Sequence, residues 1–409
     1  MQKSEFKRRR LAGMMLVLWW LVAVAPGSAL PQRSMRLVDR RTTVATIPFV
    51  LVDGRILVDV RLNGHGPFRM IFDSGASAVA SREVADQLAL PLSPSHPESG
   101  TGNQPLQVTN TTIHTVTLGS AHIADVACDV MTMSDMPPVF GNVKIDGILG
   151  RPIFDRFVVQ VNYDKHVLML FEPPLYRPVS ADVPLPFTRV RDVPLVTASL
   201  DGHAGLFGVD LGARSSILLN GWFADDDHLE SLFEGAPEIV LGWGLGGPIR
   251  GKLGRAREFN LGDIQVESPL VRLSTQRSGL LSRKDTAGLI GADILRQFTL
   301  TFDPVRRVVF FRRSNAFGAR TEFDKSGMWI IQNDAGFKVI DVVAGGAAER
   351  AGIRIDDAII DVNGKNVSGI SLPDLREEWA KLPTGTPVKL QIKRQQVVLQ
   401  TTLQLKSLV

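Results

Sequence analysis

Two aspartates stand in short motifs of nearly the same sequence. Asp73-Ser74-Gly75-Ala76 and Asp210-Leu211-Gly212-Ala213 each follow an apolar run. A chain that folds these segments face to face brings two carboxyl groups together, and such a pair shares one proton because both groups cannot easily ionise at once. One carboxylate can then take a proton from water while the other group donates one. The sequence therefore predicts general acid and base chemistry at Asp73 and Asp210.

The neighbours of the two aspartates suit loops that approach each other closely. Gly75 and Gly212 lack a Cβ and so permit tight turns beside the carboxyl groups. Ser74 can hydrogen-bond across to the opposite loop and hold the carboxyl groups in one plane, whereas the second motif has Leu211 at the matching position. A buried hydrogen bond is worth about 1 kcal/mol net. The missing hydroxyl is therefore expected to loosen the site without unfolding it.

The surroundings of the two motifs repeat as well. Short β-runs punctuated by glycine and proline fill both copies, and each copy ends with a short helix and further strands. Markers in the same order at near-equal spacing predict two duplicated, mainly β lobes, at 46–175 and 176–315. The markers are turns at 62–65 and 200–203, turns at 118–119 and 261–262, and apolar-apolar-glycine segments at 148–150 and 289–291.

Residues 46–313 resemble a single-chain, two-lobed aspartic peptidase of the pepsin and retropepsin superfamily. The two aspartate motifs and the two apolar-apolar-glycine segments carry the resemblance, and the run Ile148-Leu149-Gly150-Arg151 is closer to retropepsins. The resemblance implies two β-barrel lobes with an Asp73/Asp210 dyad at their interface. It implies peptide or protein substrates and no cofactor. Leu211 departs from the family pattern, in which threonine or serine is usual.

The resemblance also implies flaps, which are hairpins that close over a substrate. Gly100 and Gly102 lie in a polar, glycine-containing tip at 99–104, and Trp243 and Gly244 lie in its counterpart at 242–247. Two such flaps are typical of the retroviral dimer rather than of pepsin. Trp243 either covers apolar substrate surface or packs on its own lobe, and the sequence leaves both interpretations open.

Residues 322–405 resemble a bacterial PDZ domain, which is a small α+β fold. The resemblance rests on the run from Gly345-Gly346-Ala347 through the Asn363-Gly364 turn. Such domains usually bind an extended peptide by adding it to a sheet edge. By analogy Gly327, Met328 and Trp329 form the peptide-binding loop. The alternative is a domain that packs on the lobes or gates their cleft.

The N-terminus predicts export. Residues 1–29 join a basic start, a 15-residue apolar stretch and small residues before Ala29, as in a cleaved signal peptide. The stretch is shorter than the roughly 20 residues of a spanning helix, so we expect no stable membrane span after cleavage. These residues carry the whole net charge of +4, which leaves a neutral mature chain and no basis for binding nucleic acid. The single cysteine, Cys128, cannot form an intrachain disulfide, and this suits a periplasmic or secreted protein of the bacterial cell envelope.

Other chemistries find no support in the sequence. The seven histidines include no His-Glu-x-x-His motif, a lone cysteine cannot build a thiolate zinc site, and no metal is expected. The prediction is an aspartic endopeptidase with a PDZ domain for peptide binding or gating. The alternative is a catalytically silent peptide-binding or adaptor protein built on the same lobes.

Overall fold

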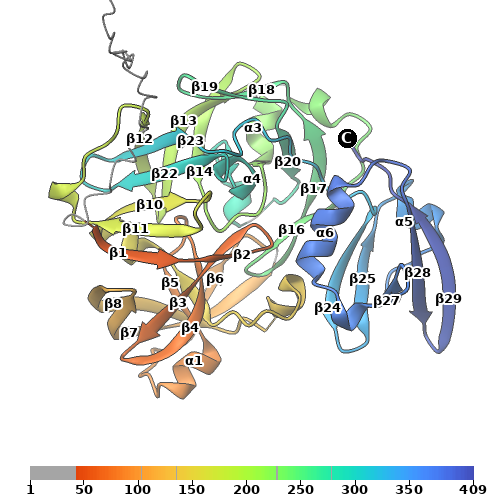
Figure 1. The fold of residues 1–409 in the computed structure, drawn as a ribbon, viewed down its shortest axis with the longest axis horizontal. Coiled ribbons are helices and arrows are strands. Elements are labelled where there is room, and N and C mark those ends of the chain that lie inside the picture. The colour runs from red at the N-terminus through yellow and green to blue at the C-terminus, as the bar shows by residue number, and fades with distance from the viewer. Residues whose placement is uncertain (1–42, 103, 135, 227–228, 278) are drawn as a thin grey trace, which may run out of the picture. The chain divides into compact units, whose positions relative to one another are not determined.

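The computed structural model describes residues 43–102, 104–134, 136–226, 229–277 and 279–409. The predicted signal peptide at 1–29 therefore lies outside the described residues. The chain is mainly β, as predicted, with strands in three sheets and a few short helices (Figure 1). The predicted domain boundaries at 46–175, 176–315 and 322–405 remain predictions.

The first lobe is an eight-stranded sheet that surrounds the loop of Asp73. Its order is β2-β3-β4-β9-β5-β8-β7-β6, with β9 parallel to β4 and β5 parallel to β8. The elements are β1 Thr43–Pro48, β2 Val50–Val52, β3 Arg55–Leu62, β4 His65–Phe72, β5 Ala78–Ser81, α1 Arg82–Gln87, β6 His96–Ser99, β7 Pro105–Leu118, β8 Ala121–Met131, η1 Pro137–Phe140, β9 Gly147–Leu149, α2 Arg151–Arg156, β10 Val158–Asn162, β11 Val167–Phe171 and η2 Pro173–Leu175.

The second lobe repeats these pairings. Strand β21 is parallel to β14 and β20 is parallel to β15, as β9 and β8 are to β4 and β5. This confirms the duplication. The elements are β12 Val183–Val190, β13 Val193–Leu200, β14 His203–Val209, β15 Ile217–Leu219, α3 Gly221–Asp226, η3 Glu230–Phe233, β16 Ile239–Gly244, β17 Gly247–Arg255, β18 Glu258–Leu261, β19 Ile264–Glu267, β20 Leu270–Ser274, η4 Leu280–Ser282, β21 Gly288–Ile290, α4 Ala292–Leu295, β22 Phe298–Asp303 and β23 Val308–Arg313.

The two copies share a sheet and a core. Strand β10 pairs with β22, so the last hairpin of each copy meets the other and the fifteen-stranded sheet runs on into the second lobe. Phe154 packs against Phe72 on one side and against Phe302 of the second copy on the other. One continuous apolar cluster therefore fixes the relative position of the loops that follow β4 and β14.

The C-terminal domain has a separate core and a six-stranded sheet in the order β24-β25-β26-β28-β29, with β27 beside β26. Ser371 caps helix α6 by accepting a hydrogen bond from the amide of Asp374, and Leu372, Leu375 and Trp379 form the buried face of that helix. The elements are β24 Met328–Asn333, β25 Gly336–Val342, α5 Ala347–Arg350, β26 Ala358–Val362, β27 Lys365–Asn366, η5 Val367–Gly369, α6 Leu372–Lys381, β28 Pro387–Arg394 and β29 Val397–Gln404.

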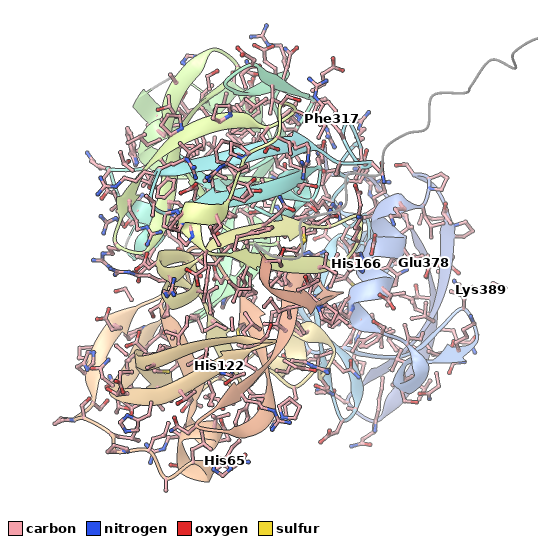
Figure 2. The ribbon with its side chains drawn as sticks, turned by 60° about the vertical axis from the view of Figure 1, so that its left-hand side comes forward. His65, His122, His166, Phe317, Glu378 and Lys389 are labelled. Atoms are coloured by element: carbon pink, nitrogen blue, oxygen red, sulfur yellow. The ribbon has the colours of Figure 1, made fainter. Side chains whose placement is uncertain are left out.

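His65, at the turn between β3 and β4, is exposed at the edge of the first lobe (Figure 2). Within the part of the chain that the structure describes, no helix is long and apolar enough to cross a membrane.

Candidate active site

Each aspartate stands directly after a buried strand that a second strand holds in place. The amide of Asp73 donates to Leu149 O at 3.1 Å, and the amide of Asp210 donates to Ile290 O at 3.0 Å. The glycine that follows each partner strand is needed for this crossing. A Cβ at Gly150 would lie 2.1 Å from Ala76 O, and in the second copy the corresponding glycine is equally confined. The apolar-apolar-glycine segments found in the sequence thus support the loops of the two aspartates.

The carboxyl groups of Asp73 and Asp210 are buried and hydrogen-bond to each other. Backbone amides of the same loops donate hydrogen bonds to both carboxyl groups. Gly75 N donates to Asp73 Oδ1 at 2.7 Å, while Gly212 N and Ala213 N donate to Asp210 Oδ1 at 2.8 and 3.1 Å. A Cβ at Gly212 would lie only 2.1 Å from Asp73 Oδ2, so this glycine is what lets the two loops approach.

The two carboxyl groups have unequal proton affinities. Burial raises the pKa of Asp73 well above its ordinary value, and the nearby charge of Asp210 raises it further. Burial also raises the pKa of Asp210, but its hydrogen bonds from Asp73 and from two backbone amides oppose the rise. Asp73 accepts only one such amide bond. Of the two carboxyl groups, Asp73 therefore has the more strongly raised pKa.

The side-chain hydrogen bonds between the two loops come from the first loop. Ser74 is buried, its Oγ donates to Val209 O at 2.7 Å, and it accepts from Leu211 N at 3.1 Å. Leu211 is fully buried in the apolar core and offers no hydroxyl in return. Ser74 thus makes the expected hydrogen bonds across to the other loop. Leu211 makes no side-chain hydrogen bond in return, as its apolar side chain predicts.

An arginine that the sequence reasoning missed makes a further tie from the first lobe to the second loop. Arg55 donates from Nε to Gly212 O at 2.9 Å and from Nη2 to Trp243 O at 3.2 Å. Its Nη1 pairs with Asp53 at 3.0 Å, and Arg214 pairs with the other oxygen of Asp53 at 3.1 Å. The only sequence signal was an acid and a base two residues apart, Asp53 in the turn before β3 and Arg55 at the start of that strand. That pattern alone is common on surfaces.

The two predicted flaps are hairpin tips, and they meet. Gly102 N donates to Leu245 O at 2.8 Å and Gln104 N donates to Gly246 O at 2.9 Å. A Cβ at Gly100 or Gly102 would lie 2.2 Å from the opposite tip, so both glycines are needed for contact. Gly244 is just as close to Thr101. The backbone carbonyl of Trp243 accepts a hydrogen bond from Arg55. Its side chain is partly buried against an apolar cluster with residues from both lobes.

Beneath the flaps is a cavity of about 440 Å³ that contains both aspartates. Its walls are mostly apolar, and charged side chains such as Glu98 and Arg283 also line it. In the described ranges of the chain, no cluster of three or more histidine, cysteine, aspartate or glutamate side chains is placed to hold a metal ion. The apolar lining comes from both lobes and includes Val79, Val108, Met131, Leu218, Leu241 and Leu289.

Comparison with protein families agrees with this geometry. Residues 58–153 match the aspartyl protease family model, and residues 322–405 match the PDZ domain model. The chain contains an aspartyl protease domain and a PDZ domain. A comparison with curated proteins gave no match. The aspartyl protease match begins within β3 and ends within α2 of the first lobe, and the PDZ match spans the same residues that the sequence predicts.

The PDZ domain places its predicted peptide-binding loop away from solvent. Gly327, Met328 and Trp329 are all buried. Gly327 has a φ of +70° and its carbonyl accepts from Val343 N at 2.9 Å. Trp329 lies in the apolar cluster that includes Val139 and Phe140 of the first lobe. In this arrangement the loop is covered by the protein's own chain.

Proposed function

We propose that this protein is an endopeptidase that hydrolyses peptide bonds with the Asp73/Asp210 dyad. Its aspartyl protease domain supports a hydrolase at the family level. The observation that carries the finer proposal is the buried, hydrogen-bonded pair of carboxyl groups at the base of a cavity under two meeting flaps.

The unequal proton affinities assign the roles. The Asp210 carboxylate takes a proton from a water molecule, whose oxygen attacks the scissile carbonyl carbon. Asp73 gives its proton to the carbonyl oxygen, which forms a tetrahedral diol. The proton on Asp210 then passes to the amide nitrogen as the C–N bond breaks, and the diol returns a proton to Asp73. Water is the nucleophile throughout, so no covalent acyl-enzyme forms.

A digest of a peptide library by the mature chain, from acidic to neutral pH, tests this proposal. Asp73→Asn is expected to abolish cleavage, whereas Asp59→Asn, at an exposed position that does not line the cavity, is expected to retain it. Cleavage in H₂¹⁸O should place ¹⁸O in the new carboxyl group. Cleavage that persists in Asp73→Asn rules out the dyad.

The second candidate is a catalytically silent peptide-binding protein, and the lack of a side-chain hydrogen bond from Leu211 favours it. In this case the cavity would bind peptides, and the aspartate pair would not hydrolyse them. Wild-type protein that binds library peptides and leaves every one intact at all pH values would decide for it.

We further propose that the protein is exported to the periplasm or secreted after removal of residues 1–29. The basic and apolar N-terminus supports this proposal. The N-terminal sequence of the protein recovered from the cell envelope tests it, and the expected first residue is Leu30. An intact N-terminus in the cytosolic fraction would contradict it.

A further inference from the structure

The groove of the PDZ domain is occupied by the first lobe. A PDZ ligand adds to an exposed sheet edge beside a helix, and among the described strands β24 pairs only with β25. The short helix η1 contacts both β24 and α6. Next to it, a Cβ on Gly141 would lie 3.0 Å from Pro373 Cδ and 3.5 Å from Leu372 Cβ, at the start of α6. Residues 137–141 therefore cover the site where a ligand would dock.

Arg376 of α6 fastens this contact. Its side chain is buried and donates to Val139 O of η1 at 2.9 Å and to Ile330 O of β24. It stacks on Trp329, 4.8 Å from the ring centre, and lies 3.7 Å from Asp53. Residues 137–141 thus bind through Arg376 and apolar packing. They do not add a strand to the sheet edge, which is how the sequence analysis expects a peptide ligand to bind. Asp53 also pairs with Arg55, which hydrogen-bonds to the carbonyl of Trp243 in the second flap. Arg376 is therefore linked to that flap through Asp53 and Arg55.

The PDZ domain also holds the second flap directly. Asp341 on β25 accepts from Val240 N at 3.0 Å and pairs with Arg250 at 3.2 Å. Val240 and Arg250 belong to β16 and β17, the two strands of that flap. One docked domain therefore grips the first lobe at η1 and the flap of the second lobe.

Docking is also continuous with the cavity. Met136, the residue before η1, lines the cavity that contains the dyad. The flap tips are joined by backbone hydrogen bonds, and a substrate that passes between the tips must break these bonds. Any contact that stabilises the closed tips slows this step. The PDZ contacts at 137–141 and at β16 and β17 are such contacts.

We propose that the docked PDZ domain is a latch on the closed flaps, with residues 137–141 as its internal ligand. An extended peptide with apolar side chains and a carboxylate for Arg376 competes for the groove, displaces the segment and frees the second flap. This inference rests on the proposed peptidase function, since it concerns access to the same site.

Two matched pairs of variants test the latch from its two sides. Gly141→Ala places a Cβ against Pro373, and Gly235→Ala is its control because that glycine has nearly the same φ, +69° against +70°, with nothing within 4 Å. Asp341→Ala removes the grip on the flap. Asp356→Ala is its control, since among the described residues the Asp356 carboxylate forms an ion pair only with Lys338, inside the same domain.

Hydrogen exchange is measured first, in full-length mature protein that carries Asp73→Asn. Gly141→Ala is expected to speed exchange in 239–250 by about tenfold, although the change lies on the other lobe, and Asp341→Ala is expected to do the same in 136–142. Both controls should match the parent. A merely local disturbance would not cross between these segments, so exchange equal to the controls overturns the latch. This readout does not depend on cleavage.

Cleavage is then compared in protein with both aspartates. Each variant, unlike its control, should raise kcat/KM about threefold or more, and a fall would show that docking activates the enzyme and would overturn the latch. A synthetic peptide with the sequence of residues 134–143 should bind Gly141→Ala protein more tightly than wild type, because the internal segment no longer competes. Equal binding would contradict the internal ligand. Exchange that responds while no variant cleaves any peptide would refute the proposed function and leave the latch standing.

Discussion

Replacing Ser74 with alanine tests how the loops of Asp73 and Asp210 are held together. Ser74 Oγ makes two buried hydrogen bonds across the lobe interface, at 2.7 Å to Val209 O and at 3.1 Å from Leu211 N. Each is worth about 1 kcal/mol net, and a buried carbonyl or amide left without a partner costs about 1–3 kcal/mol. We therefore expect Ser74→Ala to lower the free energy of unfolding by about 2–4 kcal/mol, a large share of the roughly 5–15 kcal/mol of an ordinary domain.

Ser216 provides the matched control. It is also fully buried, but its Oγ has no hydrogen-bond partner among the described residues. Ser216→Ala should therefore change the free energy of unfolding by no more than about 0.5 kcal/mol, or raise it, because a buried hydroxyl without a partner is itself unfavourable. Urea unfolding of both variants at one pH gives the comparison.

Kinetics separate a loosened dyad from a general loss of stability. Ser74 does not line the cavity, so Ser74→Ala should lower kcat by about tenfold or more and leave KM nearly unchanged. Ser74→Thr keeps the hydroxyl and should recover part of the loss. If Ser74→Ala and Ser216→Ala unfold alike and cleave alike, Ser74 does not hold the loops together.

Further predictions concern the proton, the loop glycine and the flap. Asp73→Asn should gain stability relative to wild type as the pH rises from about 4 to 8: the folded-state pKa of Asp73 is raised, so the stability from its proton is complete below the unfolded pKa near 4 and is lost as pH passes the folded value. Urea unfolding at pH 4, 6 and 8 checks this, and a constant difference would contradict it. Gly212→Ala should abolish cleavage and destabilise the fold, since its Cβ meets Asp73 Oδ2, while Gly369→Ala, with nothing within 4 Å, should be close to neutral in both assays. Gly102→Ala keeps the flap tips from meeting at all, even over a bound substrate, and should therefore lower kcat/KM about tenfold, whereas the latch variants only ease the parting of the tips. Gly369→Ala again serves as the control and should cleave at nearly the wild-type rate.

The two aspartate loops were readable from the sequence because the signals that mark them are local. Asp73 and Asp210 each sit at a fixed point in a strand-loop-strand unit, and glycines mark the places where backbones touch. Because the two copies carry the same motif, each position in one copy can be compared with the matching position in the other. Leu211 could be read as a departure for the same reason, since the first copy shows a serine at that position.

The contacts that hold the second loop could not be read in the same way. Arg55 is 157 positions from Gly212 and 188 from Trp243, and its partners are backbone carbonyls, which leave no trace in side-chain sequence. The same holds for Arg376, which reaches Val139 O across 237 positions. Only the folded chain brings these groups together.

The sequence by itself determined the two lobes, the paired aspartates, the flaps and the C-terminal PDZ domain, because each depends on periodicity, turn residues and a repeated spacing within short segments. Tertiary structure alone decided that the pKa of Asp73 is raised well above its ordinary value, since burial and the nearby charge of Asp210 are its main causes. It also decided that the flaps meet and that the PDZ groove is already filled. Those outcomes depend on packing between distant segments, where a buried arginine finds its partners only after the lobes have folded.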